Sequence, residues 1–197
     1  MNKAIFFDLD GVLVDLVNVH HQSLNSALEL YGYSAISETS RKTYNGIPTR
    51  IKLKYLDIPE NDVEKIFNAK QTFTHRDMIE ILRPDKDKIE LLYYLKMSGY
   101  LVACVTNSIR ATAELALELS YLDLFMDSIV SNEDAPYPKP HPSPYLCAME
   151  DLVVYSGVAI EDNDNGIWSA RDAGLKVIQV AGPQEVNLSL LDRINSL

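Results

Sequence analysis

At 197 residues the chain is long enough for one buried core with a modest insertion, and short for two full domains. Hydrophobic residues make up 47% and charged residues 23% of it, a composition typical of a globular domain that argues against disorder. The formal net charge of -10 opposes attraction to a phosphate backbone, so we do not expect nucleic acid as a partner.

Short apolar runs that end in polar residues predict the strands. The first run, Lys3 to Phe7, leads into Asp8-Leu9-Asp10-Gly11, and the later runs are Tyr100 to Val105, Ser128 to Val130, Gly157 to Ile160 and Lys176 to Val180. Segments with helical spacing lie between or after them, at residues 86–98, 109–120, 143–152, 165–173 and 186–197. Gly99 and Gly174 follow two of these segments, as helix C-terminal caps do. This alternation predicts a mainly parallel sheet covered on both faces, with ligands bound at the carboxyl ends of its strands.

One stretch, from about Leu16 to Arg83, breaks the alternation. It shows helical patterns at residues 20–31 and 61–81 and no convincing strand. We therefore expect a catalytic core of residues 1–15 and 84–197 and a helical cap of residues 16–83. The predicted fold class is α/β: a Rossmann-like, doubly wound parallel sheet with a helical cap inserted after the first strand.

The setting expected for the chain is the reducing cytoplasm. The N-terminus lacks the apolar segment and cleavage site of a signal peptide, and no apolar run approaches the roughly 18 residues of a membrane helix. Cys104 and Cys147 each lie in an apolar stretch, where small buried side chains are expected and no disulfide framework is implied.

An acidic pair follows the first predicted strand. Asp8 and Asp10 lie two residues apart just before Gly11, so they would point to roughly the same side if the extended geometry continued. Two carboxylates so close repel each other, and a site built on them needs a cation or a proton. Taken alone, the string could also be an exposed turn, in which Asp and Gly are common.

Three later strings carry further polar residues in a suggestive order. They are Thr106-Asn107-Ser108 after a strand, Lys139 between two prolines, and the run from Glu161 to Asn165 after another strand. Each has an ordinary alternative: a turn or helix N-cap for the first and third, and a solvated charge on a stiff loop for Lys139.

Together, the four strings resemble the motifs of the haloacid dehalogenase superfamily, in its phosphoglycolate phosphatase and β-phosphoglucomutase branch. The resemblance begins with Phe7-Asp8-Leu9-Asp10-Gly11-Val12 and spans essentially the whole chain. It implies a phosphatase, with Asp8 as the nucleophile and Asp10 as general acid and base. It also implies that Thr106 and Asn107 bind the transferring phosphoryl group, while Lys139 neutralises its charge.

The resemblance also implies Mg²⁺ as the cofactor. The ligands would be Asp8, the backbone carbonyl of Asp10 and Asp162, with Glu161 acting through water. Magnesium suits such a set, because it takes oxygen ligands from one or two carboxylates, waters and phosphate oxygens. Asn163 departs from the small serine common in the family at this position.

The predicted cap resembles the small helical cap of that branch and favours small organic phosphates as substrates. His20 corresponds by its distance from Asp8 to a cap histidine of the mutase, and the loop ending at Arg50 resembles one that brings an arginine to substrate. His20 could equally be a partly exposed helix residue beside His21, and Arg50 could be one of the exposed arginines that are common on protein surfaces. We expect a small phosphorylated metabolite as partner, no nucleic acid or membrane, and a monomer or weak dimer.

Two alternatives to a phosphatase follow from these observations. One is a phosphosugar mutase. Leu16 argues against it, because it replaces the small polar residue that usually follows the first motif of the mutase. The other is a catalytically idle binding protein with the same fold, which the intact set of motif residues disfavours.

Overall fold

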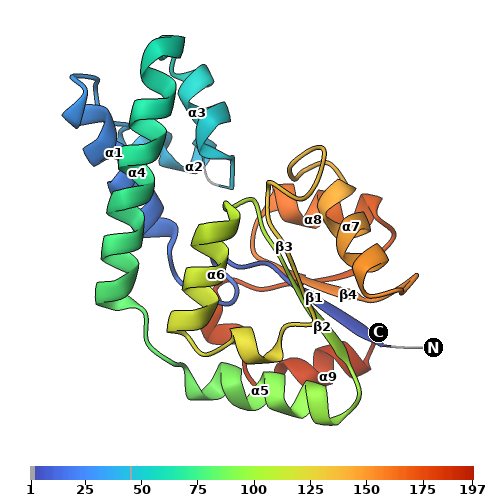
Figure 1. Ribbon diagram of the computed structural model, residues 1–197. Helices are drawn as coiled ribbons and strands as arrows, with labels where there is room; N and C mark the ends of the chain where they lie inside the picture. Colours follow the sequence, from blue (N-terminus) through green and yellow to red (C-terminus); the bar gives the residue numbers. More distant parts are fainter. Residues whose placement is uncertain (1–2, 45) are drawn as a thin grey trace. The chain divides into compact units, whose positions relative to one another are not determined.

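The computed structural model describes residues 3–44 and 46–197, which form two compact units (Figure 1). One unit comprises the chain up to Asp15 together with Leu82–Leu197, and the other is Leu16–Ile81.

A parallel five-stranded sheet forms the centre of the first unit. Its strands are β1 (Ala4–Phe7), β2 (Leu101–Val105), β3 (Ser128–Val130), β4 (Val158–Glu161) and β5 (Lys176–Gln179), in the order β3-β2-β1-β4-β5. The register pairs Phe6 with Ala103 on one side and with Ala159 on the other. Both faces of β1 are covered, because all four of its residues are buried. The predicted α/β class and parallel sheet are confirmed.

Helices cover both faces of this sheet. They are α5 (Lys86–Met97), α6 (Arg110–Leu119), α7 (Ser143–Asp151), α8 (Asp164–Asp172) and α9 (Leu190–Asn195), with 3₁₀ turns at Asp123–Phe125 and Pro183–Glu185. Figure 1 shows α7 and α8 on one face and α5, α6 and α9 on the other, which is the doubly wound arrangement. A cluster centred on Phe6, Val105, Tyr145 and Ala170 fills the face under α7 and α8.

The last helix is shorter than its sequence pattern indicates. We expected it to begin at Val186, but α9 begins at Leu190. The side chain of Asn187 accepts a hydrogen bond from the Ser189 amide and donates one to the Gln184 carbonyl. These local bonds satisfy backbone groups in a turn and so compete with helix formation. The two glycine caps, in contrast, are confirmed, with φ of 79° at Gly99 and 85° at Gly174.

The elements of the second unit among the described residues are helices joined by loops. They are α1 (Val17–Leu30), α2 (Glu38–Tyr44), α3 (Thr49–Tyr55) and α4 (Glu60–Ile81). Helices α1 and α4 pack along each other and bury apolar residues such as Leu24, Leu28, Ile66 and Met78. Helices α2 and α3 were not predicted, because seven residues give too little periodicity to stand out.

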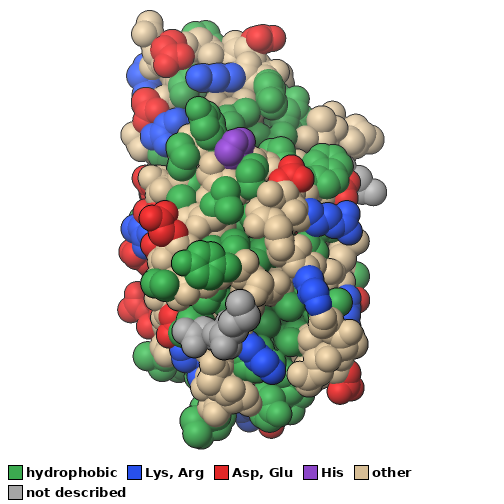
Figure 2. Space-filling model, turned by 90° about the vertical axis from the view of Figure 1, so that its right-hand side faces the viewer, with side chains coloured by type: hydrophobic (Ala, Val, Ile, Leu, Met, Phe, Trp, Pro, Cys, Tyr) green, Lys and Arg blue, Asp and Glu red, His purple; other side chains and the backbone are tan. Residues whose placement is uncertain are grey.

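The surface carries charges of both signs. On the face drawn in Figure 2, basic and acidic side chains lie interspersed with hydrophobic ones. Within the part of the chain that the structure describes, no helix combines the length and apolar character needed to cross a membrane.

Candidate active site

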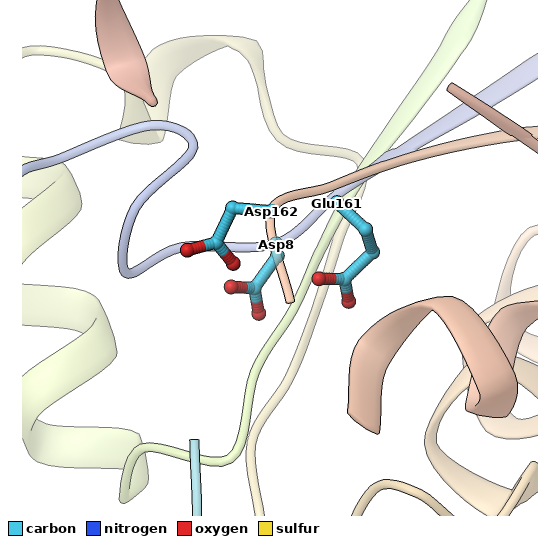
Figure 3. A group of neighbouring side chains, drawn as sticks. All are labelled: Asp8, Glu161 and Asp162. Carbon is cyan, nitrogen blue, oxygen red and sulfur yellow. The ribbon is translucent and has the colours of Figure 1, made fainter. Parts of the chain in front are cut away.

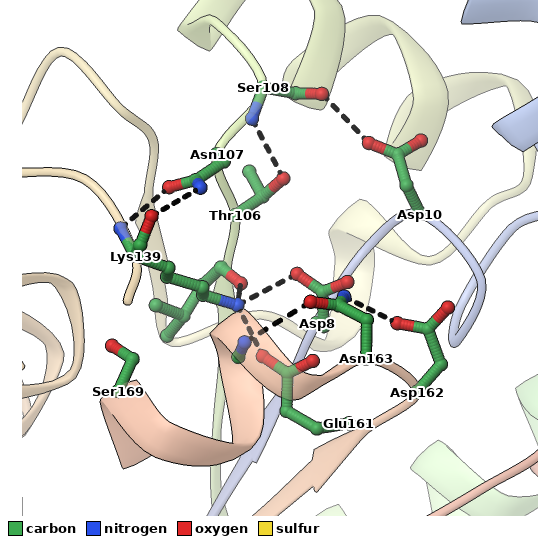
Figure 4. A network of polar contacts seen from close by, with 12 residues as sticks. Asp8, Asp10, Thr106, Asn107, Ser108, Lys139, Glu161, Asp162, Asn163 and Ser169 are labelled. Carbon is green, nitrogen blue, oxygen red and sulfur yellow. Dashed lines mark hydrogen bonds and ion pairs between the residues drawn. The ribbon is translucent and has the colours of Figure 1, made fainter. Parts of the chain in front are cut away.

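The polar residues that follow three neighbouring strands meet at one edge of the sheet. Asp8 follows β1, Thr106 follows β2, and Glu161 ends β4 with Asp162 directly after it. Lys139 comes from the long connection between β3 and α7. Figures 3 and 4 show these side chains converging at the carboxyl ends of the strands, where doubly wound sheets bind ligands.

A buried lysine links two of the carboxylates. The Lys139 ammonium donates to Oδ1 of Asp8 at 2.8 Å, to Oε1 of Glu161 at 2.5 Å and to the Val105 carbonyl at 2.7 Å. All three side chains are almost fully buried, at 4%, 6% and 0% exposure for Lys139, Asp8 and Glu161. An ammonium group has three protons to donate, and these three short bonds hold the end of the Lys139 side chain in place.

The pKa values in this cluster are shifted by burial and by the closeness of several carboxylates to one ammonium group. Burial raises the pKa of Asp8 well above its usual value, the Glu161 carboxylate raises it further, and Lys139 only partly offsets them. Burial lowers the pKa of Lys139, but Asp8 and Glu161 together raise it above its ordinary value, so it carries its proton. Burial also raises the pKa of Asp162. Three carboxylates thus face a single ammonium group, which favours binding of an additional cation.

The same carboxylates fit a divalent metal ion. One carboxylate oxygen from each of Asp8, Glu161 and Asp162 lies within 4.8 Å of the others. Oε2 of Glu161 is buried and has no hydrogen-bond partner among the described residues. A buried carboxylate oxygen in that state is costly unless a cation or water meets it. The donor set, all oxygen, is the one that Mg²⁺ prefers.

Two glycines make room for these carboxylates. Gly11 has φ of 94°, and a Cβ atom there would lie 2.2 Å from Oδ2 of Asp162. A Cβ at Gly166, in the first turn of α8, would lie 2.0 Å from the Glu161 carboxyl group. The close approach of both acidic side chains therefore depends on glycine at these positions.

Asp10 faces a different partner from Asp8. Its Oδ2 accepts a hydrogen bond of 2.7 Å from the Ser108 hydroxyl (Figure 4). The Ser108 amide in turn donates to the Thr106 hydroxyl oxygen at 3.0 Å. Ser108 thus ties the loop after β2 to Asp10, a role that sequence reasoning missed.

The side chain of Asn107 holds the loop that carries Lys139. Its amide nitrogen donates to the Lys139 carbonyl at 3.0 Å, and its oxygen accepts from the Lys139 amide at 2.9 Å. This pair of bonds joins the loop after β2 to the loop before α7. Contact between Asn107 and the substrate stays a prediction, whereas the structure shows that the Asn107 side chain positions Lys139.

Asn163, where the family commonly has serine, has two local partners. Its Oδ1 caps helix α8 by accepting from the Gly166 amide at 3.2 Å, and its amide nitrogen donates to Oδ1 of Asp162 at 2.7 Å. The second bond partly offsets the effect of burial on the pKa of Asp162. Asn163 therefore serves both as the N-cap of α8 and as a hydrogen-bond donor to a candidate metal ligand.

Tyr145 also belongs to the cluster and was not predicted. Its hydroxyl donates to Oε1 of Glu161 at 2.6 Å and lies 3.3 Å from the Lys139 ammonium. Burial and then the charge of Glu161 raise its pKa, so the phenol stays protonated. An apolar position on a helix signals only core packing, so the sequence carries no mark of this contact.

The two predicted cap residues, His20 and Arg50, lie in the second unit. Nδ1 of His20 lies 3.0 Å from the ammonium nitrogen of Lys70, which is buried. Arg50 forms two hydrogen bonds with Glu64, of 2.7 and 3.0 Å, and its guanidinium lies 3.5 Å from the centre of the Phe67 ring. Both residues are thus held by neighbours within that unit.

Comparison with known proteins places the chain in a family. A model described as "Haloacid dehalogenase-like hydrolase" matches residues 5–180, and the chain therefore belongs to this family. The predicted superfamily and the predicted class of enzyme, a phosphatase of the haloacid dehalogenase type, are confirmed.

Particular relatives agree with this assignment. Pyrophosphatase PpaX of Bacillus cereus (strain B4264) is 30% identical over 181 residues, which cover 91% of this chain and 83% of the relative. Among solved structures, CbbY from Rhodobacter sphaeroides in complex with phosphate has a TM-score of 0.82 at 25% identity, covering 92% of this chain and 87% of that one. β-Phosphoglucomutase from Clostridium difficile shares the fold, with a TM-score of 0.85 at 19% identity over 100% and 98% of the two chains.

Proposed function

We propose that the chain is a Mg²⁺-dependent phosphatase that hydrolyses small phosphomonoesters, of the sugar phosphate or phosphoglycolate type, through an aspartyl phosphate on Asp8. The observation that carries this proposal is the buried ion pair between Asp8 and Lys139, next to Glu161 and Asp162. A carboxylate nucleophile divides the hydrolysis into two easier steps.

In the first step, a carboxylate oxygen of Asp8 bonds to phosphorus while the bond to the leaving oxygen breaks. Asp10 donates a proton to that leaving oxygen. In the second step, water bonds to phosphorus and gives a proton to Asp10, the bond to Asp8 breaks, and phosphate leaves. Ser108 orients Asp10 for both proton transfers, since its hydroxyl is bonded to the Asp10 carboxylate.

The remaining residues position and neutralise the phosphoryl group. Thr106 lies buried at the end of β2 and offers its hydroxyl, and Lys139 supplies a fixed positive charge beside Asp8. Fixed charges of this kind stabilise the transition state without reorganising during the reaction.

Asp8, Asp162 and the backbone carbonyl of Asp10 would hold the Mg²⁺ ion, and Glu161 would act on it through water. When bound, it would neutralise phosphate oxygens and offset the repulsion between the carboxylates.

For the substrate, the relatives favour a small phosphorylated metabolite. A structure of a CbbY mutant is in complex with xylulose 1,5-bisphosphate, and we propose that His20 and Arg50 contact the organic part of a comparable substrate here. The 30% identity to a pyrophosphatase favours pyrophosphate as a second candidate, whose leaving group would be phosphate. A cytoplasmic location and a monomer or weak dimer remain part of the proposal.

Phosphate release from p-nitrophenyl phosphate tests the proposed activity. We expect release with Mg²⁺, loss on adding EDTA, and recovery with excess Mg²⁺. A panel of sugar phosphates, phosphoglycolate, nucleoside monophosphates and pyrophosphate, compared by kcat/KM, then identifies the substrate class. If the protein hydrolysed none of these compounds, the proposal would be contradicted and a binding protein would be favoured.

A mutase is tested separately with β-glucose 1-phosphate and a bisphosphate primer. Rapid formation of glucose 6-phosphate without phosphate release would favour the mutase. Phosphate release without isomerisation is the result that our proposal predicts.

A further inference from the structure

Tyr145 is a buried polar group that the mechanism above does not use. It lies in the first turn of α7, is 0% exposed, and packs edge-on against Phe6 with ring centroids 6.2 Å apart. Its ring is thus part of the core, and phenylalanine would fill the same space. Its hydroxyl, in contrast, lies within the charged cluster.

The Tyr145 hydroxyl and the Lys139 ammonium both donate hydrogen bonds to the same oxygen of the Glu161 carboxylate. Oε1 of Glu161 accepts from Tyr145 at 2.6 Å and from Lys139 at 2.5 Å. Lys139 also donates to Asp8 and the Val105 carbonyl, and its ammonium nitrogen lies 3.3 Å from the Tyr145 hydroxyl oxygen. An ionised carboxylate only accepts hydrogen bonds, so the proton between Tyr145 and Glu161 comes from the hydroxyl. Tyr145 therefore acts as a donor to Glu161.

The other oxygen of Glu161 is left without a partner. Oε2 is buried and accepts no hydrogen bond from the described residues. With two donors on Oε1, rotation of the carboxyl group would break two charge-assisted bonds. The carboxyl group also lies against Gly166, where a side chain would collide with it. Its orientation is thus fixed from both sides.

We propose that Tyr145 is a positioning residue, which orients the Glu161 carboxylate so that Oε2 stays available to the divalent cation or to a water bound to it. This inference rests on the proposed function, because it assumes the metal site of that function. Tyr145 touches no reacting atom, and its effect passes through Glu161.

Two variants separate the hydroxyl from the packing of the ring. Tyr145→Phe removes only the hydroxyl, and Tyr145→Met removes the ring as well while filling much of the space. The readout is binding of Mn²⁺ to the full chain without substrate, followed by electron paramagnetic resonance. We expect both variants to bind Mn²⁺ about tenfold more weakly than wild type, the effect of losing one hydrogen bond to a charged group. With Mg²⁺ and p-nitrophenyl phosphate, kcat should fall while KM stays within about twofold.

Tyr33→Phe is the matched control. The Tyr33 hydroxyl also donates to a carboxylate, Oδ2 of Asp62 at 2.7 Å, but both residues lie in the other unit. This variant loses the same kind of bond and should keep the wild-type affinity for Mn²⁺.

The outcomes separate this inference from the proposed function. A folded Tyr145 variant whose affinity for Mn²⁺ stays within about twofold of wild type would overturn it. So would failure of both variants to fold, since the Tyr145 hydroxyl would then be required for the fold as a whole. If wild type itself bound no Mn²⁺, the metal site of the proposed function would be contradicted as well.

Discussion

The ammonium nitrogen of Lys139 lies 2.8 Å from Oδ1 of Asp8, although 131 residues separate the two in the chain. The loop that carries Lys139 is held in place by the side chain of Asn107, through two hydrogen bonds to the Lys139 backbone. The candidate nucleophile and its counter-charge are therefore brought together by contacts between the loops that follow three parallel strands.

Removal of this counter-charge should impair catalysis. We expect Lys139→Met to lower kcat on p-nitrophenyl phosphate by roughly 10²- to 10³-fold at saturating Mg²⁺, because a fixed charge at the phosphoryl group is lost. Lys88→Met is the matched control: Lys88 is equally buried and paired with Asp85, outside the site. It should lose stability and keep kcat. A Lys139→Met enzyme as active as the control would contradict the role assigned to Lys139.

Stability without metal should depend on pH through Asp8. Its pKa is raised by burial and by Glu161, so the folded state binds more protons than the unfolded state above the ordinary value of 3.8. The free energy of unfolding therefore falls as the pH rises from 3.8 towards the raised pKa. Asp8→Asn removes this contribution, and in EDTA at about pH 7 we expect its Tm to exceed that of wild type by at least about 2 °C.

The difference in Tm between Asp8→Asn and wild type should shrink towards about pH 5, where more of Asp8 is protonated. Added Mg²⁺ should raise the Tm of wild type more than that of the variant. A difference that grows as the pH falls would show that Asp8 does not carry the excess charge.

Gly11 should be irreplaceable for a steric reason. Alanine there would place Cβ 2.2 Å from Oδ2 of Asp162, whereas nothing lies within 4 Å of a Cβ at Gly174, which has a similar positive φ. Both substitutions cost roughly 1–2 kcal/mol for the left-handed backbone. Only Gly11→Ala should also weaken Mn²⁺ binding and lower kcat. Equal loss of Mn²⁺ affinity in Gly174→Ala would refute the steric explanation.

Ser108 should matter most for substrates with poor leaving groups. Ser108→Ala removes the hydrogen bond to Oδ2 of Asp10, and we expect kcat/KM to fall roughly tenfold for an alkyl phosphate. The loss should be smaller for p-nitrophenyl phosphate, which needs less protonation of its leaving oxygen. Ser120→Ala, which removes a buried hydroxyl bonded to the Ala116 carbonyl, is the control. Equal losses on both substrates would argue against a role through Asp10.

Much of the fold could be predicted because parallel strands buried on both faces are apolar runs, and all five were located to within a residue or so. The four short strings that contain Asp8, Thr106, Lys139 and Asp162 each follow a predicted strand. Because the strands are parallel, their carboxyl ends lie side by side, and these residues could be predicted to meet there. Their order along the chain, more than any single string, indicated a common site.

Contacts that join distant segments could not be predicted in this way. Ser108 belongs to a recognised string, but its partner Asp10 is 98 residues away. Tyr145 occupies a helix position at which any large apolar residue would pack, and only the structure shows its hydroxyl on Glu161. Gly166 fits the helical pattern of its segment in the sequence, and only the structure places the Glu161 carboxyl group against it.

The central claim, that Asp8 carries the phosphoryl group, is tested most directly by trapping the intermediate. Wild-type enzyme mixed with Mg²⁺ and p-nitrophenyl phosphate is quenched rapidly in acid, digested and mapped by mass spectrometry. We predict a phosphorylated peptide with the modification on Asp8, absent from Asp8→Asn, which should retain its fold and lose turnover. Phosphate mapped to another residue, or near wild-type activity of Asp8→Asn, would contradict the mechanism.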